Sequence, residues 1–416
     1  MTSATDSIRA LYITEFWPNA QLSAAGRRHE QIVRILQNMG CLVCCASTAQ
    51  NTHETHTKDN SYQTLALTLN TQESEASIVS YNPNLVVFDR FLQEEKWGWI
   101  FDTHLPSCIK ITDTSDFYSL RSSREKALLL NRPWVIEDLI QDSHLYRELS
   151  SLYKSDLSLI ISEFEWTVLQ KILDFKTPSL LHVPFQVTAS EILTPVQRPH
   201  WSQRKHLVFV GQYRHRPNVD CINYIQSELW PELISLLPDL ELHIYGAGFP
   251  SEFVHRYNAR YKSLQIKGPI KDLHNTLARY RLLFAPLRFG AGQKGKFIDA
   301  FCTYTPVVTS SLGAEGMWNL EELSNSIADS SHELIQRVLS LYSNSHNWDC
   351  TQDQIHALLQ RFQSSQYEDT LKHHLLNLMQ SPQKRSGAQI IGALLKQNAY
   401  QAQRYKYKYI QEKTKK

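Results

Sequence analysis

The chain has 416 residues, 42% of them hydrophobic, which is enough apolar material for two domain cores rather than one. Its 43 lysines and arginines nearly balance its 41 aspartates and glutamates, so no overall charge favours nucleic acid or a membrane surface as a partner. No apolar run approaches the roughly 20 residues that span a bilayer, and residues 1–6 lack the start of a secretory signal, which predicts a cytoplasmic protein.

The first half alternates predicted strands and helices. Strands are predicted at 8–14, 41–47, 85–88, 107–112 and 157–162, and helices at 29–39 and 165–173. A helical insertion is predicted at about 119–153, and the polar segment 53–75 is predicted to be a loop. This alternation is typical of a parallel α/β domain.

The pattern restarts after an interruption by prolines and charged residues at 194–205. Strands are predicted at 207–210, 240–245, 264–267, 282–286 and 307–310, and helices at 219–236, 273–280 and 296–302. We therefore expect two Rossmann-like domains with a cleft between them, at 1–198 and 199–384. A C-terminal helix at about 385–416 is expected to pack back on the first domain.

Glycine or positive charge follows four successive strands of the second half. The residues are Arg214 and Arg216 after the first, Gly246 and Gly248 after the second, Gly268 after the third, and 288–292 after the fourth. Ligands of open parallel sheets collect at the carboxyl ends of the strands, so a phosphorylated ligand is the economical explanation.

The most informative segment is 288–301, which places Gly290, Gly292 and Gly295 with two lysines between a strand and a helix. Glycines let backbone amides approach an anion, the helix start favours negative charge, and Lys294 or Lys296 supplies a compact cation. The alternative is a tight turn with solvated lysines. Asp299, one turn into the helix, is placed to accept hydrogen bonds from sugar hydroxyls, or else only complements the helix dipole.

The first half offers a complementary loop at 23–28. Ser23 is a plausible N-cap, Gly26 allows close approach of backbone, and Arg27 and Arg28 add charge; a routine helix cap with surface arginines is the alternative. Polar clusters also follow two strands, one at 89–90 and the other at 113–116 with Arg121 and Arg124. They either bind an acceptor in the cleft or form structural salt bridges.

Other chemistries lack their signatures. The segment 246–251 does not complete G-x-G-x-x-G, because Ser251 stands at its end, and no zinc-protease, P-loop or nucleophile-elbow motif occurs. Cys41 and Cys44 have the spacing of a zinc or redox half-site, but no second pair completes it, so we expect core packing. The basic and aromatic end, 404–416, is either a solvated helix end or a contact to an anionic surface.

Several of these segments resemble the nucleotide-sugar half of GT-B glycosyltransferases, family 4-like (glycosyl transferases group 1). They are 209–211, 214–220, 242–248, 285–296, 306–309 and 313–316. The resemblance is strong over about 207–318. The first half is similar to the acceptor domain of the same family, more weakly, through 23–26, 87–90 and 113–116.

The resemblance implies transfer of a sugar from a nucleotide-diphosphate sugar to a glycan, lipid-linked or protein acceptor, as in polysaccharide biosynthesis. It implies retention at the anomeric carbon, with no metal ion, no cofactor and no nucleic-acid partner, because lysine and arginine stabilise the leaving diphosphate. The implied catalytic residues are Lys294, Arg214 and Asp116. The implied donor and phosphate ligands are Gly26, Gly211, Arg216, Gly246, Gly248, Gly290, Gly292, Gly295 and Asp299, the last in place of a ribose-binding glutamate.

The chain departs from the family pattern at three positions. Ala291 stands where the first glutamate of an acidic pair is expected, and Gln212 and Pro217 stand where many members have arginine and lysine. A binding or scaffold protein that kept the fold and lost turnover is therefore a second hypothesis, and a sugar-nucleotide epimerase a third. Peripheral contact with the inner face of a membrane is left open.

Overall fold

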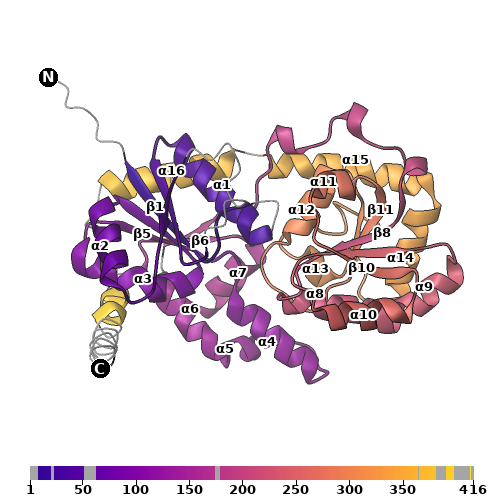
Figure 1. Ribbon diagram of the computed structural model, residues 1–416, viewed down its shortest axis with the longest axis horizontal. Helices are drawn as coiled ribbons and strands as arrows, with labels where there is room; N and C mark the ends of the chain where they lie inside the picture. Colours follow the sequence, from indigo (N-terminus) through magenta and orange to yellow (C-terminus); the bar gives the residue numbers. More distant parts are fainter. Residues whose placement is uncertain are drawn as a thin grey trace. The chain divides into compact units, whose positions relative to one another are not determined.

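The structure is a computed structural model that describes residues 8–19, 23–50, 62–173, 179–363, 365–380, 390–397 and 413 (Figure 1). Contacts divide the chain into two compact units. Unit 1 comprises the described residues within 1–120, 135–184 and 365–416, and unit 2 those within 121–134 and 185–364. The main segment of unit 2 thus begins at Phe185, and the chain returns to unit 1 at Ser365. The sequence-based prediction placed the start of the second domain at residue 199 and its end at residue 384.

Unit 1 is built on a seven-stranded parallel sheet in the order β3-β2-β1-β4-β5-β6-β7. The strands are β1 (Arg9–Thr14), β2 (Leu42–Ser47), β3 (Gln63–Ala66), β4 (Leu85–Asp89), β5 (Ile109–Asp113), β6 (Leu157–Ile160) and β7 (Leu180–His182). Successive side chains of a strand face opposite sides of the sheet. In β1, Ala10 and Tyr12 therefore join one core cluster, and Leu11 and Ile13 join another.

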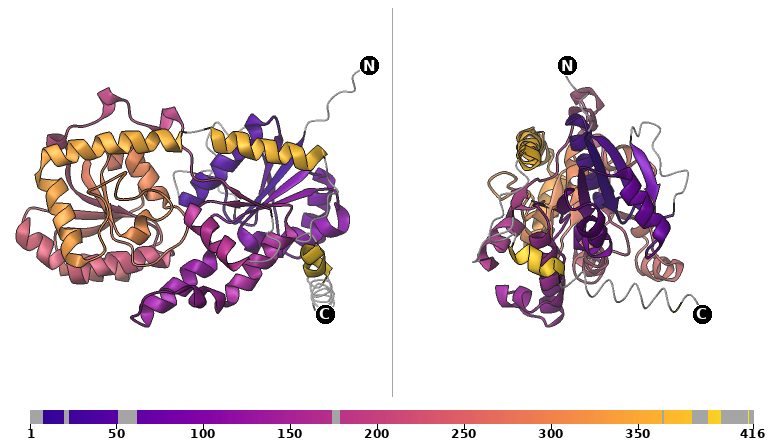
Figure 2. Two further views of the ribbon diagram at one scale, coloured as in Figure 1. Left: turned by 180° about the vertical axis from the view of Figure 1, so that it is seen from behind. Right: turned by 90° about the vertical axis from the view of Figure 1, so that its left-hand side faces the viewer.

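Helices cover both faces of this sheet (Figure 2). The helices of unit 1 are α1 (Ala24–Asn38), α2 (Gln72–Tyr81), α3 (Arg90–His104), α5 (Ile136–Ile140), α6 (Ser143–Lys154), α7 (Glu163–Ile172) and α16 (Gln366–Gln380), of which α5 lies away from the sheet (Figure 1). Helix α4 (Tyr118–Leu129) begins in unit 1, and its residues from Arg121 on are grouped with unit 2. The apolar side chains of α1 and α16 share one core cluster, and those of α2 and α3 share the other.

The segment 53–75 was wrongly predicted to be a loop in its second part. Residues 63–66 form β3, and α2 begins at Gln72; residues 53–61 lie outside the described residues. Strand β3 is at the edge of the sheet and three of its four residues are exposed. An edge strand is held by backbone hydrogen bonds on one side only, and in β3 Leu65 alone packs against the apolar core, so the strand signal in its sequence is weak.

Unit 2 is built on a five-stranded parallel sheet in the order β10-β9-β8-β11-β12. The strands are β8 (Lys205–Val210), β9 (Leu242–Tyr245), β10 (Leu264–Gly268), β11 (Tyr280–Ala285) and β12 (Val307–Thr309). The helices are α8 (Arg216–Tyr224), α9 (Trp230–Leu236), α10 (Ser251–Arg260), α11 (Leu273–Leu277), α12 (Gly295–Cys302), α13 (Ser311–Ala314), α14 (Ser331–Ser343) and α15 (Ser345–Phe362). The two parallel sheets confirm the predicted α/β architecture with two Rossmann-like parts.

The helix predicted at 219–236 is not a regular α-helix throughout. A π-helical stretch, Ile225–Leu229, joins α8 to α9, and Pro231 lies at the start of α9. Proline has no backbone N–H and crowds the carbonyl one turn earlier, and the wider π turn accommodates this.

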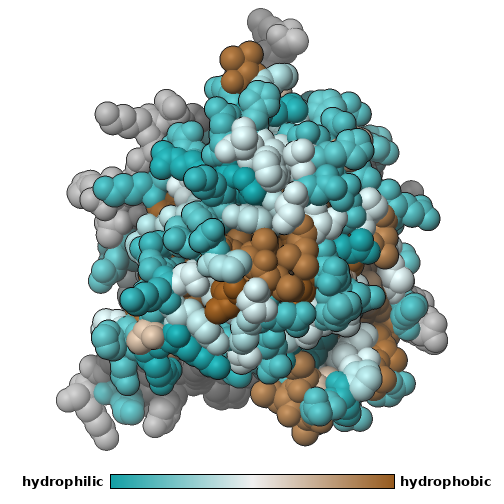
Figure 3. All heavy atoms as spheres, turned by 90° about the vertical axis from the view of Figure 1, so that its right-hand side faces the viewer, coloured by the Kyte–Doolittle hydropathy of each residue, from teal (hydrophilic) through white to brown (hydrophobic). Residues whose placement is uncertain are grey.

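The described surface is mainly polar, with local apolar exposure. The face shown in Figure 3 is largely hydrophilic, with apolar atoms gathered in a central patch. None of the helices in the described residues combines the length and the apolar character needed to cross a bilayer.

All seven cysteines are free, and Cys41 and Cys44 are buried, which confirms the prediction that they pack in the core.

Candidate functional site

The candidate site of unit 2 lies at the carboxyl edge of its sheet. Strands β10, β9, β8 and β11 are consecutive neighbours and all run parallel, so the segments that follow them gather at one edge. This confirms that the four glycine-bearing or basic strand ends are brought together. An edge of this kind is where ligands of open α/β sheets bind.

Two of the predicted ligand glycines are required by the packing of the chain itself. A Cβ atom on Gly246 would lie 1.9 Å from the carbonyl oxygen of Gly211, and one on Gly211 would lie 2.5 Å from the side chain of Asn218. The turns after β8 and β9 therefore touch through their glycines. Gly248, by contrast, has a φ of +83°, and the nearest described atom to the place of a Cβ there is 4.0 Å away, so its backbone is approachable.

The loop between β11 and α12 turns sharply through glycines. Gly292 has a φ of 64°, in the left-handed region that favours glycine, and Gly290 has a φ of 158°. The Ser310 hydroxyl donates a hydrogen bond to the Leu287 carbonyl, which ties the loop to the segment after β12. Helix α12 starts at Gly295, and its N-cap residue, Lys294, makes no capping hydrogen bond with its side chain.

The two lysines of this loop donate hydrogen bonds to neutral oxygens. Lys294 is 8% exposed, and its Nζ donates to the Leu312 carbonyl oxygen at 3.0 Å. Lys296 Nζ donates to Asn218 Oδ1 at 2.7 Å and lies 4.2 Å from the centre of the Phe209 ring. Burial lowers the pKa of Lys296 to about 8, and the nearby Lys294 ammonium acts in the same direction. Among the described residues of unit 2, no carboxylate forms an ion pair with Lys296. Glu125 pairs with Arg216, Asp299 with His274 and Asp220 with Arg288.

Hydrogen bonds from Gln293 and Arg124 hold the glycine loop in place. Gln293 accepts from the Phe185 backbone N–H at 2.8 Å and donates to the Gly316 carbonyl at 2.8 Å. Arg124 of α4 donates to the Gly290 carbonyl at 2.9 Å and forms a bidentate pair with Glu315 at 2.8 Å. These hydrogen bonds fix the position of the loop backbone without a bound molecule.

The remaining predicted residues of unit 2 are less enclosed. Arg214 is exposed in the turn after β8, and Arg216, 71% exposed, pairs with Glu125 at 2.5 Å. Asp299 is 6% exposed and lies 3.6 Å from His274 Nε2 of α11. Their functional roles stay predictions.

Lys296 was predicted as an alternative to Lys294 for the phosphate cation, and Arg124 as part of a polar cluster that binds an acceptor or forms salt bridges. Asn218 was given no role. The hydrogen bonds of Lys296 to Asn218 and of Arg124 to Gly290 could not be predicted, because they join residues 78 and 166 positions apart.

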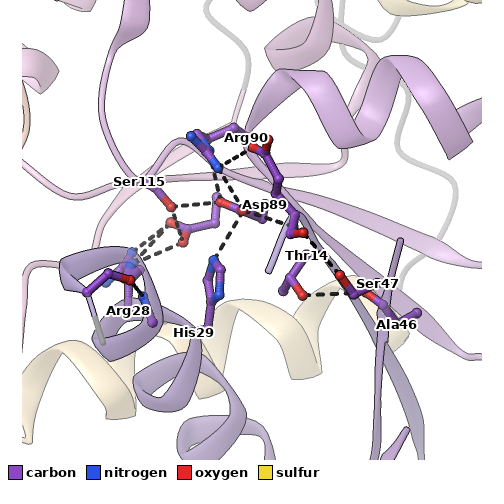
Figure 4. Close-up of polar contacts among 12 residues, drawn as sticks. Thr14, Arg28, His29, Ala46, Ser47, Asp89, Arg90 and Ser115 are labelled. Atoms are coloured by element: carbon purple, nitrogen blue, oxygen red, sulfur yellow. Dashed lines mark hydrogen bonds and ion pairs between the residues drawn. The ribbon is translucent and has the colours of Figure 1, made fainter. Parts of the chain in front are cut away.

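Unit 1 has a buried polar cluster at the corresponding edge of its own sheet (Figure 4). Register places Asp89 of β4 opposite Asp113 of β5, and both carboxylates are fully buried. Arg28 of α1 donates to both oxygens of Asp113, at 3.0 Å from Nε to Oδ2 and 2.9 Å from Nη2 to Oδ1. His29 Nε2 lies 3.2 Å from Asp89 Oδ2.

Arg90 completes this cluster from an unusual backbone conformation. Its φ is 64°, a left-handed value that costs free energy for a residue with a Cβ atom. Its guanidinium contacts Asp89 at 3.2 Å and Glu15 at 2.8 Å. Although burial acts in the opposite direction, Arg90 and His29 hold the pKa of Asp89 well below its usual range.

The residues of the loop at 23–28 make structural contacts that the sequence predicts only in part. Ser23 is the N-cap of α1 and accepts from the Gly26 N–H at 2.9 Å, as predicted. A Cβ on Gly26 would lie 2.0 Å from the Asn19 carbonyl oxygen, so the backbone that comes close is the chain's own. Arg28 is 1% exposed and committed to Asp113, so the expectation of a surface charge there is wrong. Asp116 is half-buried after β5 and acts electrostatically on Arg90.

Residues that commonly bind metals are dispersed in both units. Within the residues that the structure describes, no group of three or more histidine, cysteine, aspartate and glutamate side chains is arranged to hold a metal ion.

The sequence family described as Glycosyl transferases group 1 matches residues 204–344, which span the sheet of unit 2 and its glycine loop. No curated protein matches the chain. Solved structures with the same fold cover most of its length.

The Anabaena protein Alr3699/HepE, solved with UDP and glucose, has a TM-score of 0.64 at 11% identity, covering 89% of this chain and 100% of that chain. The pneumococcal O-GlcNAc transferase GtfA, solved with UDP and GlcNAc, has a TM-score of 0.63 at 9% identity, covering 90% of this chain and 99% of that chain. A mutant of S. aureus TarM, solved with Fondaparinux, alpha-GlcNAc-glycerol and UDP, has a TM-score of 0.55 at 13% identity, covering 74% of this chain.

This chain spans only 58% of the length of TarM. At such identities the likeness to solved structures shows the fold alone. Residues 204–344 of unit 2 are similar to the family Glycosyl transferases group 1, and the chain has the GT-B fold of solved glycosyltransferases.

Proposed function

We propose that this enzyme transfers a sugar from a uridine-diphosphate sugar to a glycan, lipid-linked or protein acceptor, with retention at the anomeric carbon and without a metal ion. The observation that carries the proposal is the pair Lys294 and Lys296 at the start of α12, whose amines donate to a backbone carbonyl and to an amide oxygen. A diphosphate is a dianion of matching charge, and a helix start beside a glycine loop suits phosphate oxygens.

The bound molecules of the relatives support the nucleotide. HepE, GtfA and TarM were each solved with UDP, and the first two with a free sugar as well. The glycine loop would hold the diphosphate, and the two lysines would stabilise the charge that develops on it as the glycosidic bond to the donor breaks. Asp299 is proposed to bind ribose hydroxyls, and Asp116 to contact the acceptor on unit 1.

A screen of nucleotide binding tests the donor. UDP, GDP, ADP, dTDP and CMP are each added to the full-length protein with magnesium and with EDTA, and the melting temperature is measured. UDP is expected to raise it equally under both conditions. A rise that requires magnesium would contradict metal independence, and no rise with any nucleotide would contradict the donor site.

Turnover is tested separately, because Ala291 stands where the family has a carboxylate and motivates the hypothesis of a binding protein without turnover. Release of UDP and the configuration of the transferred sugar are followed by NMR with UDP-glucose and UDP-GlcNAc, each with an added alcohol as the acceptor. An α-linked product is expected. Binding of UDP without release from either donor sugar would favour the scaffold hypothesis, and a β-linked product would contradict retention.

A further inference from the structure

Lys296 differs from two arginines near the glycine loop that form ion pairs with carboxylates. Arg288 pairs with Asp220, with 3.0 Å between Nε and Oδ2, and Arg124 pairs with Glu315. The Lys296 amine has instead an amide oxygen at 2.7 Å and an aromatic ring at 4.2 Å. Neither of these partners carries a compensating charge.

The orientation of the Asn218 amide is set by a second hydrogen bond. Its Nδ2 donates to the Gln212 carbonyl at 3.0 Å, so its Oδ1 is the atom that faces Lys296. Gly211 makes room for this amide, because any Cβ there would lie 2.5 Å from it. The Lys296 side chain thus reaches from α12 to Asn218 at the start of α8. Gln212 and Pro217, which precede Asn218 in the sequence, supply no cation.

The titratable groups near Lys296 do not offset its charge. The Lys294 ammonium is repulsive, and the Cys221 thiol of α8 is buried, which raises its own pKa and keeps it neutral. On the flanks, Asp220 is paired with Arg288, and Asp299 lies next to His274. A buried amine with these surroundings favours its neutral form more than a solvated lysine does.

We propose that Lys296 binds the diphosphate of the nucleotide sugar and takes up a proton from solvent as it does so. The inference rests on the proposed donor site and adds a proton linkage to it. In the free protein the amine shares its hydrogen with Asn218; when the diphosphate arrives, the Nζ atom of a neutral amine gains one proton from the buffer and becomes an ammonium. No covalent bond between heavy atoms forms or breaks.

The linkage has a size that can be measured. Because burial lowers the pKa of Lys296 to about 8 in the free protein, affinity is expected to fall about tenfold between about pH 7 and about pH 9. At about pH 8.5 the binding of each ligand molecule should take up about 0.8 proton.

Isothermal titration calorimetry of the full chain with UDP-glucose tests this. This probe is chosen because its diphosphate is esterified at both ends and does not itself titrate near neutral pH. Heats are measured in two buffers of different ionisation enthalpy, since their difference reports the protons taken up. The variants are Lys296→Arg, which keeps a charge that does not titrate, and Lys296→Met, with Lys262→Arg as an exposed control.

The wild type and Lys262→Arg are expected to take up protons, Lys296→Arg to bind without uptake, and Lys296→Met to bind at least tenfold more weakly. Binding of UDP-glucose by the wild type with no proton uptake, or with uptake retained in Lys296→Arg, would overturn this inference and leave the donor site standing. Absence of UDP-glucose binding at every pH, with a folded protein by circular dichroism, would overturn both.

Discussion

The Lys296 amine lies 2.7 Å from Oδ1 of Asn218, an oxygen that can accept its hydrogen bond but cannot neutralise its charge. The two residues belong to different helices, α12 and α8, that follow neighbouring strands of the unit 2 sheet. The fold therefore holds a cationic group at a partly buried position beside a neutral partner. Such a position destabilises the free protein and becomes favourable when an anion arrives.

Asn218→Asp should weaken donor binding. The new carboxylate would lie where the amide oxygen does, pair with Lys296 and repel the diphosphate, so we expect UDP-glucose affinity to fall by tenfold or more. The pH dependence of binding should also disappear, because the paired lysine stays protonated. Calorimetry at about pH 7 and about pH 9 measures both effects, and unchanged affinity would place the diphosphate elsewhere.

Lys296→Met should stabilise the free protein while impairing ligand binding. Replacing a buried, uncompensated cation by an apolar side chain of similar length removes a desolvation penalty, for which we expect a gain of roughly 1–3 kcal/mol in the free energy of unfolding near neutral pH. Urea denaturation measures it, with Lys262→Met as the exposed control. A loss of stability in Lys296→Met would show that the lysine contributes to the fold instead.

Gly246→Ala should be far more harmful than Gly268→Ala. The added methyl on Gly246 would meet the Gly211 carbonyl oxygen at 1.9 Å, whereas Gly268 has open space around it and only a φ of +86° to oppose a side chain. We expect about 1 kcal/mol for the second change, from backbone strain, and several times more for the first. Denaturation curves of the two variants give the comparison, and equal losses would contradict the close approach of the two turns.

Arg28→Met should destabilise unit 1 more than the double variant Arg28→Met with Asp113→Leu. The single change leaves the Asp113 carboxylate buried without a counter-ion, for which about 3–5 kcal/mol is expected. Removing both charges leaves an apolar contact and should recover part of the loss. If the double variant is as unstable as the sum of its single changes, the pair is not energetically coupled.

Asp89→Asn should reduce the acid sensitivity of the protein. The folded-state pKa of Asp89 is lowered, so the stabilisation by its carboxylate is present above its unfolded value and is lost as the pH falls below about 3.9. The variant should be less stable at neutral pH and lose less on acidification than the wild type. Thermal unfolding as a function of pH measures this, with the exposed Asp349→Asn as control; parallel profiles would exclude Asp89 as a source of acid lability.

The sequence was a good guide wherever the signal is local. The apolar strands of both halves except β7, the Ser23 N-cap and the glycine loop before α12 were predicted, because buried parallel strands are continuous apolar runs and glycine marks turns that other residues avoid. Strand β3 was not predicted because it is a short edge strand in which Leu65 alone packs against the apolar core.

The sequence by itself determined that this is a two-part parallel α/β protein with a glycine-rich loop before a helix, since periodicity and turn chemistry depend on neighbouring residues. Only the tertiary structure decided how each charge is used. Arg28 and Asp113 are 85 positions apart, and Lys296 and Asn218 are 78 apart. Which of several basic residues finds a carboxylate and which is left with a neutral amide depends on strand order and register, because these bring distant side chains to one edge of a sheet.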